Sequence, residues 1–131
     1  MTLESSDTAF WRSMSQLLIS NSIILDRPRG SSHPHYPELI YPLDYGYLEN
    51  TFSGDGGGID VWLGSLNTLG GHAIAKILTG ILCTFDTLKR DAEIKLLIGC
   101  TEEDLQVVRE FHQDMYTLYV PNPMVENDLS S

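Results

Sequence analysis

Hydrophobic residues recur at two different spacings along the chain, and each spacing predicts a different kind of element. Over residues 7–19 the apolar positions return every three or four residues, which is typical of an amphipathic helix within residues 1–20. The short Ile-rich run over residues 22–25 suits a strand instead. Residues 27–37 contain three prolines together with glycine and serine, so we expect a loop there.

Three later runs of apolar and β-branched residues predict the strands of a small sheet. They cover residues 59–63, 73–85 and 94–98, and Gly-rich or charged turns separate them. The second run is long enough for a helix, but Gly80 in its middle and its Ile and Thr content favour a strand.

A second helix is predicted to begin at Thr101. Its hydroxyl can cap the first turn, and the acidic residues 102–104 face the positive end of the helix dipole. Residues 121–131 are polar and are expected to form a flexible tail. Periodicity alone therefore supports an α+β class with the strands at its centre.

The composition is typical of one compact domain spanning residues 1–131, because 42% of the residues are hydrophobic. No apolar run reaches the roughly 18 residues of a membrane-spanning helix, and the first residues lack the features of a secretory signal. We therefore expect a cytoplasmic protein without a membrane partner. Cys83 and Cys100 fit buried free thiols better than a disulfide framework or a zinc site.

The chain is strongly acidic, with a net charge of -10 at pH 7. This charge argues against a general nucleic-acid or anionic-membrane surface, so we expect no nucleic-acid partner. An anionic substrate would need metal ions or a local basic cluster. Five of the eight basic residues do fall in two short segments, which contain Arg27 and Arg29, and Lys89, Arg90 and Lys95.

The most informative segment is rich in glycine and holds two aspartates. The glycines at 54 and 56–58 let the backbone turn sharply, so Asp55 and Asp60 can converge from a loop and from the start of a strand. Hard oxygen ligands arranged in this way suit Mg²⁺. On spacing alone, an acidic turn in water explains the pattern equally well.

A second acidic pair, Asp86 and Asp91, is interleaved with Lys89, Arg90 and Lys95. Such a mixture can hold a metal-phosphate complex, because the acids bind Mg²⁺ while the cations bind phosphate oxygens. Taken by itself, this segment is better explained as a solvated charged turn.

The segment YPLDYGYLENT at residues 41–51, followed by SGDG and IDV, resembles the signature of family I soluble inorganic pyrophosphatases. The usual form of that signature is YPxxYGYIPxT followed by SGDGDPLDV. Weaker correspondences extend over residues 23–116, among them Asp26-x-Pro-x-Gly-Ser and the pair Asp86 and Asp91. The resemblance implies a mainly β fold, with a small OB-like closed β-barrel of about five strands flanked by two helices, and a homo-oligomer.

The resemblance also implies metal ligands. Asp55, Asp60 and Asp91 would bind Mg²⁺, and Asp86 would join them when the substrate brings further metal. Asp26 stands where the family has a glutamate, and it is the remaining candidate ligand.

The phosphate-binding residues implied by the resemblance come from several segments. Tyr45 would offer its phenol to a phosphate oxygen or a metal-bound water, so Asp55, Asp60 and Tyr45 are the expected catalytic residues. His35 falls where the family has a phosphate-binding lysine. The further candidates are Arg29, Lys89 and Lys95. For Lys95 a local shift is needed, because the family lysine corresponds in position to Glu93.

Two departures from the family pattern bear on catalysis. Gly57 stands where the family has the middle aspartate of its DxDxxD motif, implied to be a metal ligand and the base that prepares the attacking water. Losing a general base typically costs ~10² to 10⁴ in rate. In addition, the hairpin expected between Tyr36 and Tyr41 is nearly deleted, together with a phosphate-binding arginine.

The function predicted from these residues is Mg²⁺-dependent hydrolysis of inorganic pyrophosphate, with activity reduced by the glycine at position 57. The main alternative is a non-catalytic homologue that binds Mg²⁺ and a phosphate compound as a sensor or regulatory subunit. A purely structural module and a hydrolase for another phosphate ester remain open as well.

Overall fold

The computed structural model describes residues 4–67 and 76–125. Two α-helices, one short 3₁₀ helix and six strands make up this part of the chain. In chain order they are α1 (Ser6–Ser20), β1 (Ile23–Arg27), β2 (Asp44–Leu48), β3 (Ile59–Leu63), η1 (Ser65–Asn67), β4 (Leu78–Asp86), β5 (Asp91–Ile98), α2 (Glu102–Phe111) and β6 (Tyr116–Pro121).

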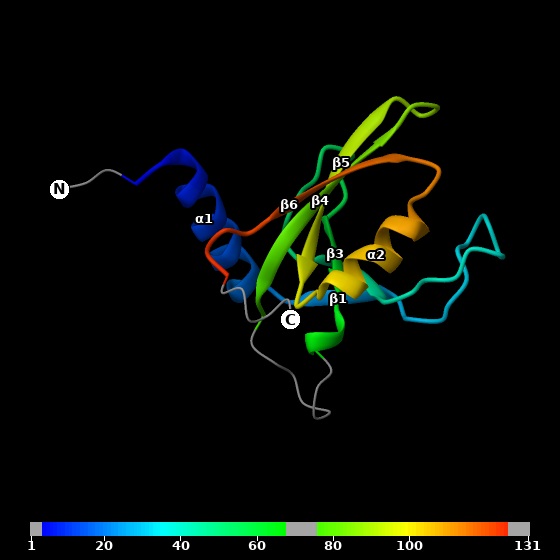
Figure 1. The fold of residues 1–131 in the computed structure, drawn as a ribbon, viewed down its shortest axis with the longest axis horizontal. Coiled ribbons are helices and arrows are strands. Elements are labelled where there is room, and N and C mark those ends of the chain that lie inside the picture. Colours follow the sequence, from blue (N-terminus) through cyan, green and yellow to red (C-terminus); the bar gives the residue numbers. More distant parts are fainter. Residues whose placement is uncertain (1–3, 68–75, 126–131) are drawn as a thin grey trace.

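The six strands form one mixed sheet in the order β1-β2-β3-β5-β4-β6. β3 and β5 run parallel, and the other neighbouring pairs are antiparallel. The hairpin formed by β4 and β5 extends beyond the body of the sheet. The two helices, α1 and α2, lie on opposite sides of the sheet (Figure 1).

Each face of the sheet carries its own hydrophobic core. On the α1 side, Trp11 and Leu18 pack against a cluster that includes Val61 and Leu96. On the α2 side, Val108 belongs to a second cluster of seven buried residues, namely Tyr41, Leu43, Trp62, Leu82, Leu97, Cys100 and Val108. The fold therefore has three layers, with the sheet between the helices.

Both predicted helices are present. α1 begins one residue before the predicted range, and Ser5 caps it by accepting a hydrogen bond from the backbone N–H of Thr8. α2 is capped by Thr101 as predicted, and the carboxylate of Asp104 completes a capping box. In the described residues both cysteines are free, with Cys100 buried and Cys83 half-buried.

The predicted strands correspond to β1, β3, β4 and β5, although residues 73–75 of the long run lie outside the described residues. Sequence reasoning missed β2 and β6. β2 is hidden by Gly46, which usually weakens a strand, but here a side chain at that position would clash with the carbonyl oxygen of Ile24 in β1.

The flexible tail predicted for residues 121–131 is wrong at its start. Pro121 belongs to β6, and the buried side chain of Asn122 donates a hydrogen bond to the carbonyl oxygen of Leu78. Residues 126–131 lie outside the described residues.

The predicted class, mainly β with two helices, is confirmed, but the closed barrel is not. Among the described residues no pairing joins β1 to β6, so these two strands are the edges of an open sheet. None of the described helices is long and apolar enough to cross a membrane.

Candidate functional site

A buried lysine lies at the centre of the candidate site. Lys95 is 5% exposed, and its ammonium donates hydrogen bonds to Tyr45 Oη at 2.9 Å, Asp60 Oδ2 at 3.1 Å and Glu93 Oε2 at 3.0 Å. These four residues are called the Lys95 cluster below.

Three neighbouring strands place the Lys95 cluster. Asp60 in β3 is the register partner of Lys95 in β5, and Glu93 precedes Lys95 by two residues, so it points to the same face of β5. Tyr45 comes from β2, and the Lys95 ammonium lies 5.3 Å from the centroid of its ring. Because the cluster stands on strands, its geometry is fixed by the sheet.

Burial by itself shifts the pKa values of Lys95 and Tyr45 in opposite directions. By itself, burial would lower the pKa of Lys95, but Tyr45, Asp60 and Glu93 outweigh this effect and hold the pKa above its ordinary value. Burial raises the pKa of Tyr45, although the nearby Lys95 ammonium opposes the change. At neutral pH the cluster therefore contains an ammonium and a protonated phenol.

Aromatic side chains form the wall beside the Lys95 cluster. The ring centroids of Tyr45 and Trp62 are 4.6 Å apart, and those of Trp62 and His112 are 5.7 Å apart. Burial lowers the pKa of His112 to about 3, and the positive charge of Lys95 adds to the effect. Within the described residues His112 Nε2 and Trp62 Nε1 lack hydrogen-bond partners. The Tyr45 ring thus packs on the core while its hydroxyl faces Lys95.

Asp55 lies in an exposed turn of the Gly-rich loop. Its Oδ1 accepts hydrogen bonds from Ser53 Oγ and from the backbone N–H of Gly57. These bonds lower its pKa, the Ser53 bond most, and the charge of Lys95 contributes to the same direction. Gly57 does not have a positive φ, and a Cβ there would meet only Asp55 Oδ1, at 3.3 Å.

Asp86 and Asp91 face each other at the exposed end of the β4–β5 hairpin. Asp86 Oδ1 accepts hydrogen bonds from the backbone N–H groups of Leu88 and Lys89, so this carboxylate stabilises the turn. Lys89 and Asp91 are exposed.

The three remaining predicted residues lie before β2. Asp26 forms an exposed ion pair with Arg27 at 3.5 Å, the backbone N–H of Arg29 donates to Asp44, and His35 is exposed in the loop. None of the three takes part in the hydrogen bonds of the Lys95 cluster. Of the predicted site residues, the structure directly joins Tyr45, Asp60 and Lys95.

Comparison with known proteins finds a similar fold and, over part of the chain, a similar sequence. No known family model matches the chain. It is 37% identical over 70 residues to an inorganic pyrophosphatase from Geobacillus stearothermophilus, a stretch that covers 53% of this chain and 41% of that relative. The solved structure of an inorganic pyrophosphatase from Coxiella burnetii superposes with a TM-score of 0.54 over 76% of this chain and 82% of that one, at 14% identity. The chain is a pyrophosphatase-like protein.

The pyrophosphatase-like fold does not by itself supply a preformed metal site here. Within residues 4–67 and 76–125 no group of three or more His, Cys, Asp or Glu side chains is arranged to hold a metal ion. Asp60, a predicted ligand, is instead paired with Lys95. The described residues therefore do not fit a resident Mg²⁺ ion.

Sequence reasoning about this pyrophosphatase-like chain missed the role of Glu93. The resemblance places Glu93 only at the position of a family lysine, whereas its carboxylate accepts a hydrogen bond from the ammonium of Lys95. The two-residue spacing within a predicted strand was the available signal, since it puts both side chains on one face.

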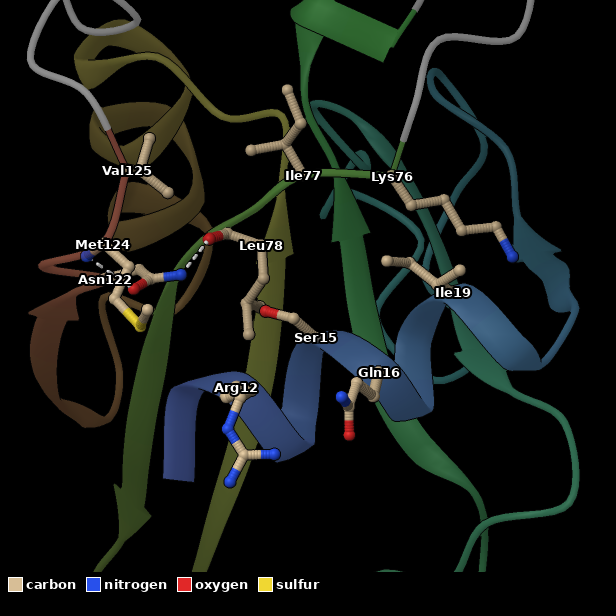
Figure 2. A pocket seen from close by; sticks show the side chains of 10 residues that line it. All are labelled: Arg12, Ser15, Gln16, Ile19, Lys76, Ile77, Leu78, Asn122, Met124 and Val125. Carbon is tan, nitrogen blue, oxygen red and sulfur yellow. Dashed lines mark hydrogen bonds between the residues drawn. The ribbon is translucent and has the colours of Figure 1, made fainter. Parts of the chain in front are cut away.

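The groove between α1, the start of β4 and the residues after β6 is separate from this site (Figure 2). It has a volume of about 340 Å³, and its lining includes none of the predicted site residues. Its two cations do not converge: Arg12 pairs with Glu4, and Lys76 donates to the carbonyl oxygens of Leu18 and Asn21. This arrangement does not make a phosphate site.

Proposed function

We propose that the protein hydrolyses inorganic pyrophosphate, which it takes up as a magnesium complex, at the Lys95 cluster. The observation that carries the proposal is that Tyr45 and Asp60, from the pyrophosphatase-like segment, meet at one buried lysine. The similarity over 70 residues and the shared fold support the choice of substrate.

Electrostatics explains why the metal would arrive with the substrate. In the Lys95 cluster two carboxylates oppose one ammonium, so one negative charge remains, and the whole chain carries -10. A bare pyrophosphate anion would be repelled. Mg²⁺ commonly binds through one or two carboxylates together with substrate phosphates, which makes the complex acceptable to an acidic site.

The other predicted residues would contact this complex from the strand ends and loops around the Lys95 cluster. In the proposal Asp26, Asp55, Asp86 and Asp91 supply oxygens to the magnesium that the substrate carries, without forming a site in its absence. Arg29, His35 and Lys89 are proposed contacts for phosphate oxygens.

Tyr45 would act as a hydrogen-bond donor in this reaction. Its oxygen accepts a hydrogen bond from Lys95, and its phenol proton, which the Asp60 carboxylate accepts in the structure, would turn to a phosphate oxygen of the substrate. The raised pKa keeps that proton in place at neutral pH, so Tyr45 is not a base. Asp55 is a weak base because its hydrogen bonds lower its pKa. Slow hydrolysis follows from these two properties.

A second candidate is a non-catalytic protein that binds a magnesium-phosphate compound as a sensor or regulatory subunit. It is favoured by Gly57, which has no side chain that could prepare the attacking water. By analogy with soluble enzymes of this kind, we also propose that the protein is cytoplasmic and forms a homo-oligomer.

Phosphate release from pyrophosphate tests the proposal. We expect release with Mg²⁺ that EDTA abolishes, and a loss of about tenfold or more in Asp60→Asn, because Asp60 is a charged partner of Lys95 in the cluster that binds the complex. Glu110→Gln, which changes an exposed acid on α2, is the matched control and should behave as the parent chain.

Two other outcomes would change the conclusion. If phosphate is not released, but magnesium with pyrophosphate raises the melting temperature, the non-catalytic candidate is correct. If neither effect is seen, the assignment of the site is wrong.

A further inference from the structure

The ammonium of Lys95 occupies the position at which the oxygens of Asp60 and Glu93 converge. Both carboxylates lie within 3.1 Å of Nζ, although they come from different strands. Two carboxylates that converge from rigid strands can supply oxygen ligands for a divalent cation. Here the convergence point already holds a positive charge.

The lysine is held firmly in this position. Its side chain is 6% exposed, while those of Asp60 and Glu93 are 29% and 30% exposed. Tyr45 adds a hydrogen bond and presents its ring to the ammonium. A metal ion from solvent would have to displace an ammonium that keeps three oxygen partners and has little exposure to water.

We propose that Lys95 is a built-in cation that keeps free divalent metal ions off the Asp60–Glu93 pair. This inference deepens the proposed function and rests on it, because it makes the substrate the source of the metal. Lys95 is thus a residue that determines which cation the site accepts, and removing its charge converts the acidic pair into a metal site.

Binding of Mn²⁺ in the absence of pyrophosphate, measured by calorimetry, tests the proposal. Replacing Lys95→Met should raise the Mn²⁺ affinity by about tenfold or more, because two carboxylates lose their internal counter-ion. Adding Asp60→Asn to that variant should abolish the gain. Arg109→Met removes an exposed cation on α2, outside the proposed site, and should leave the Mn²⁺ affinity unchanged.

Equal Mn²⁺ affinity in the parent chain and in folded Lys95→Met would overturn the proposal. If Lys95→Met does not fold, the rate at which Lys95 is acetylated in the parent chain tests the proposal instead. Mass spectrometry should show slow acetylation of Lys95 that Mg²⁺ does not change, whereas acceleration by Mg²⁺ would mean that the metal displaces the lysine. Neither measurement uses hydrolysis, so the proposed function can fail or succeed separately.

Discussion

The buried Lys95 cluster and the exposed acidic turns contain the same kinds of residue in different surroundings. In the cluster, Asp60 and Glu93 share one buried ammonium on the face of the sheet. In the turns, the exposed Asp55 and the half-buried Asp86 accept hydrogen bonds from their own backbone neighbours.

The difference teaches that position on the sheet, and not residue type, decides what these carboxylates do. A carboxylate on a strand is fixed relative to side chains distant in sequence, whereas one in a turn is satisfied by local N–H groups. The cluster should therefore control stability and cation choice, while the turns should tolerate change.

The largest expected effect is on folding, from Lys95→Met. Removing the ammonium leaves Asp60 and Glu93 close together without a counter-ion, which should lower the free energy of unfolding by roughly 2 kcal/mol. The value lies below that of a fully buried pair because both carboxylates are near one-third exposed. Urea denaturation measures it. Lys89→Met, in the turn, should change the same quantity by less than ~0.5 kcal/mol, and equal losses would contradict the contrast.

The next effect should be a gain of activity in the Gly-rich turn. Gly57→Asp should raise phosphate release from magnesium pyrophosphate by about tenfold or more, because it returns a carboxylate where the base is missing. The backbone allows the change, since Gly57 does not have a positive φ and a Cβ requires only a small shift of the Asp55 carboxylate, which lies at 3.3 Å. Gly54→Asp, where a Cβ meets nothing within 4 Å, is the matched control. Equal rates in the two folded variants would favour the non-catalytic candidate.

A smaller effect concerns His112, a buried base that lacks the oxygen partners of Lys95. Its pKa is lowered from 6.5 to about 3, so the unfolded chain binds a proton below pH 6.5 that the folded chain excludes. The free energy of unfolding that this group contributes is fully present above pH 6.5 and decreases as the pH falls, by about 1.4 kcal/mol at pH 5.5. His112→Gln should remove this part of the pH dependence, whereas the exposed His35→Gln should retain it.

Much of the fold could be predicted because its elements carry local signals. The cap at Thr101 and the β-branched run ending in β4 lie within single segments, and the structure contains both. β6 and the open sheet could not be predicted in this way. The pairing of β6 with β4 joins residues distant in sequence, and an exposed edge strand such as the one with Tyr116 and Leu118 lacks a clear apolar alternation.

The candidate site was predictable only in part for a related reason. The resemblance pointed to Tyr45 and Asp60 and, with a local shift, to Lys95, but the charge balance between these three residues depends on the register of β3 against β5. That register puts an ammonium where metal ligands were expected. The roles of Asp55 and Asp86 as metal ligands remain predictions, because the hydrogen bonds that these carboxylates form in the structure are local.

The smallest effect should come from Tyr45→Phe, which removes one of the three oxygens around Lys95 and keeps the aromatic ring. The ring packing on Trp62 is retained, and Asp60 and Glu93 still hold the ammonium, so the unfolding free energy should fall by only about 1 kcal/mol. Tyr47→Phe is the control, since the Tyr47 hydroxyl has no hydrogen-bond partner within the described part of the chain. The unfolding free energy of this variant should equal that of the parent chain. Magnesium pyrophosphate should bind more weakly to Tyr45→Phe, as calorimetry can measure, because a donor to phosphate is lost. Unchanged binding with a large loss of stability would make Tyr45 a packing residue and would limit the Lys95 cluster to a role in folding.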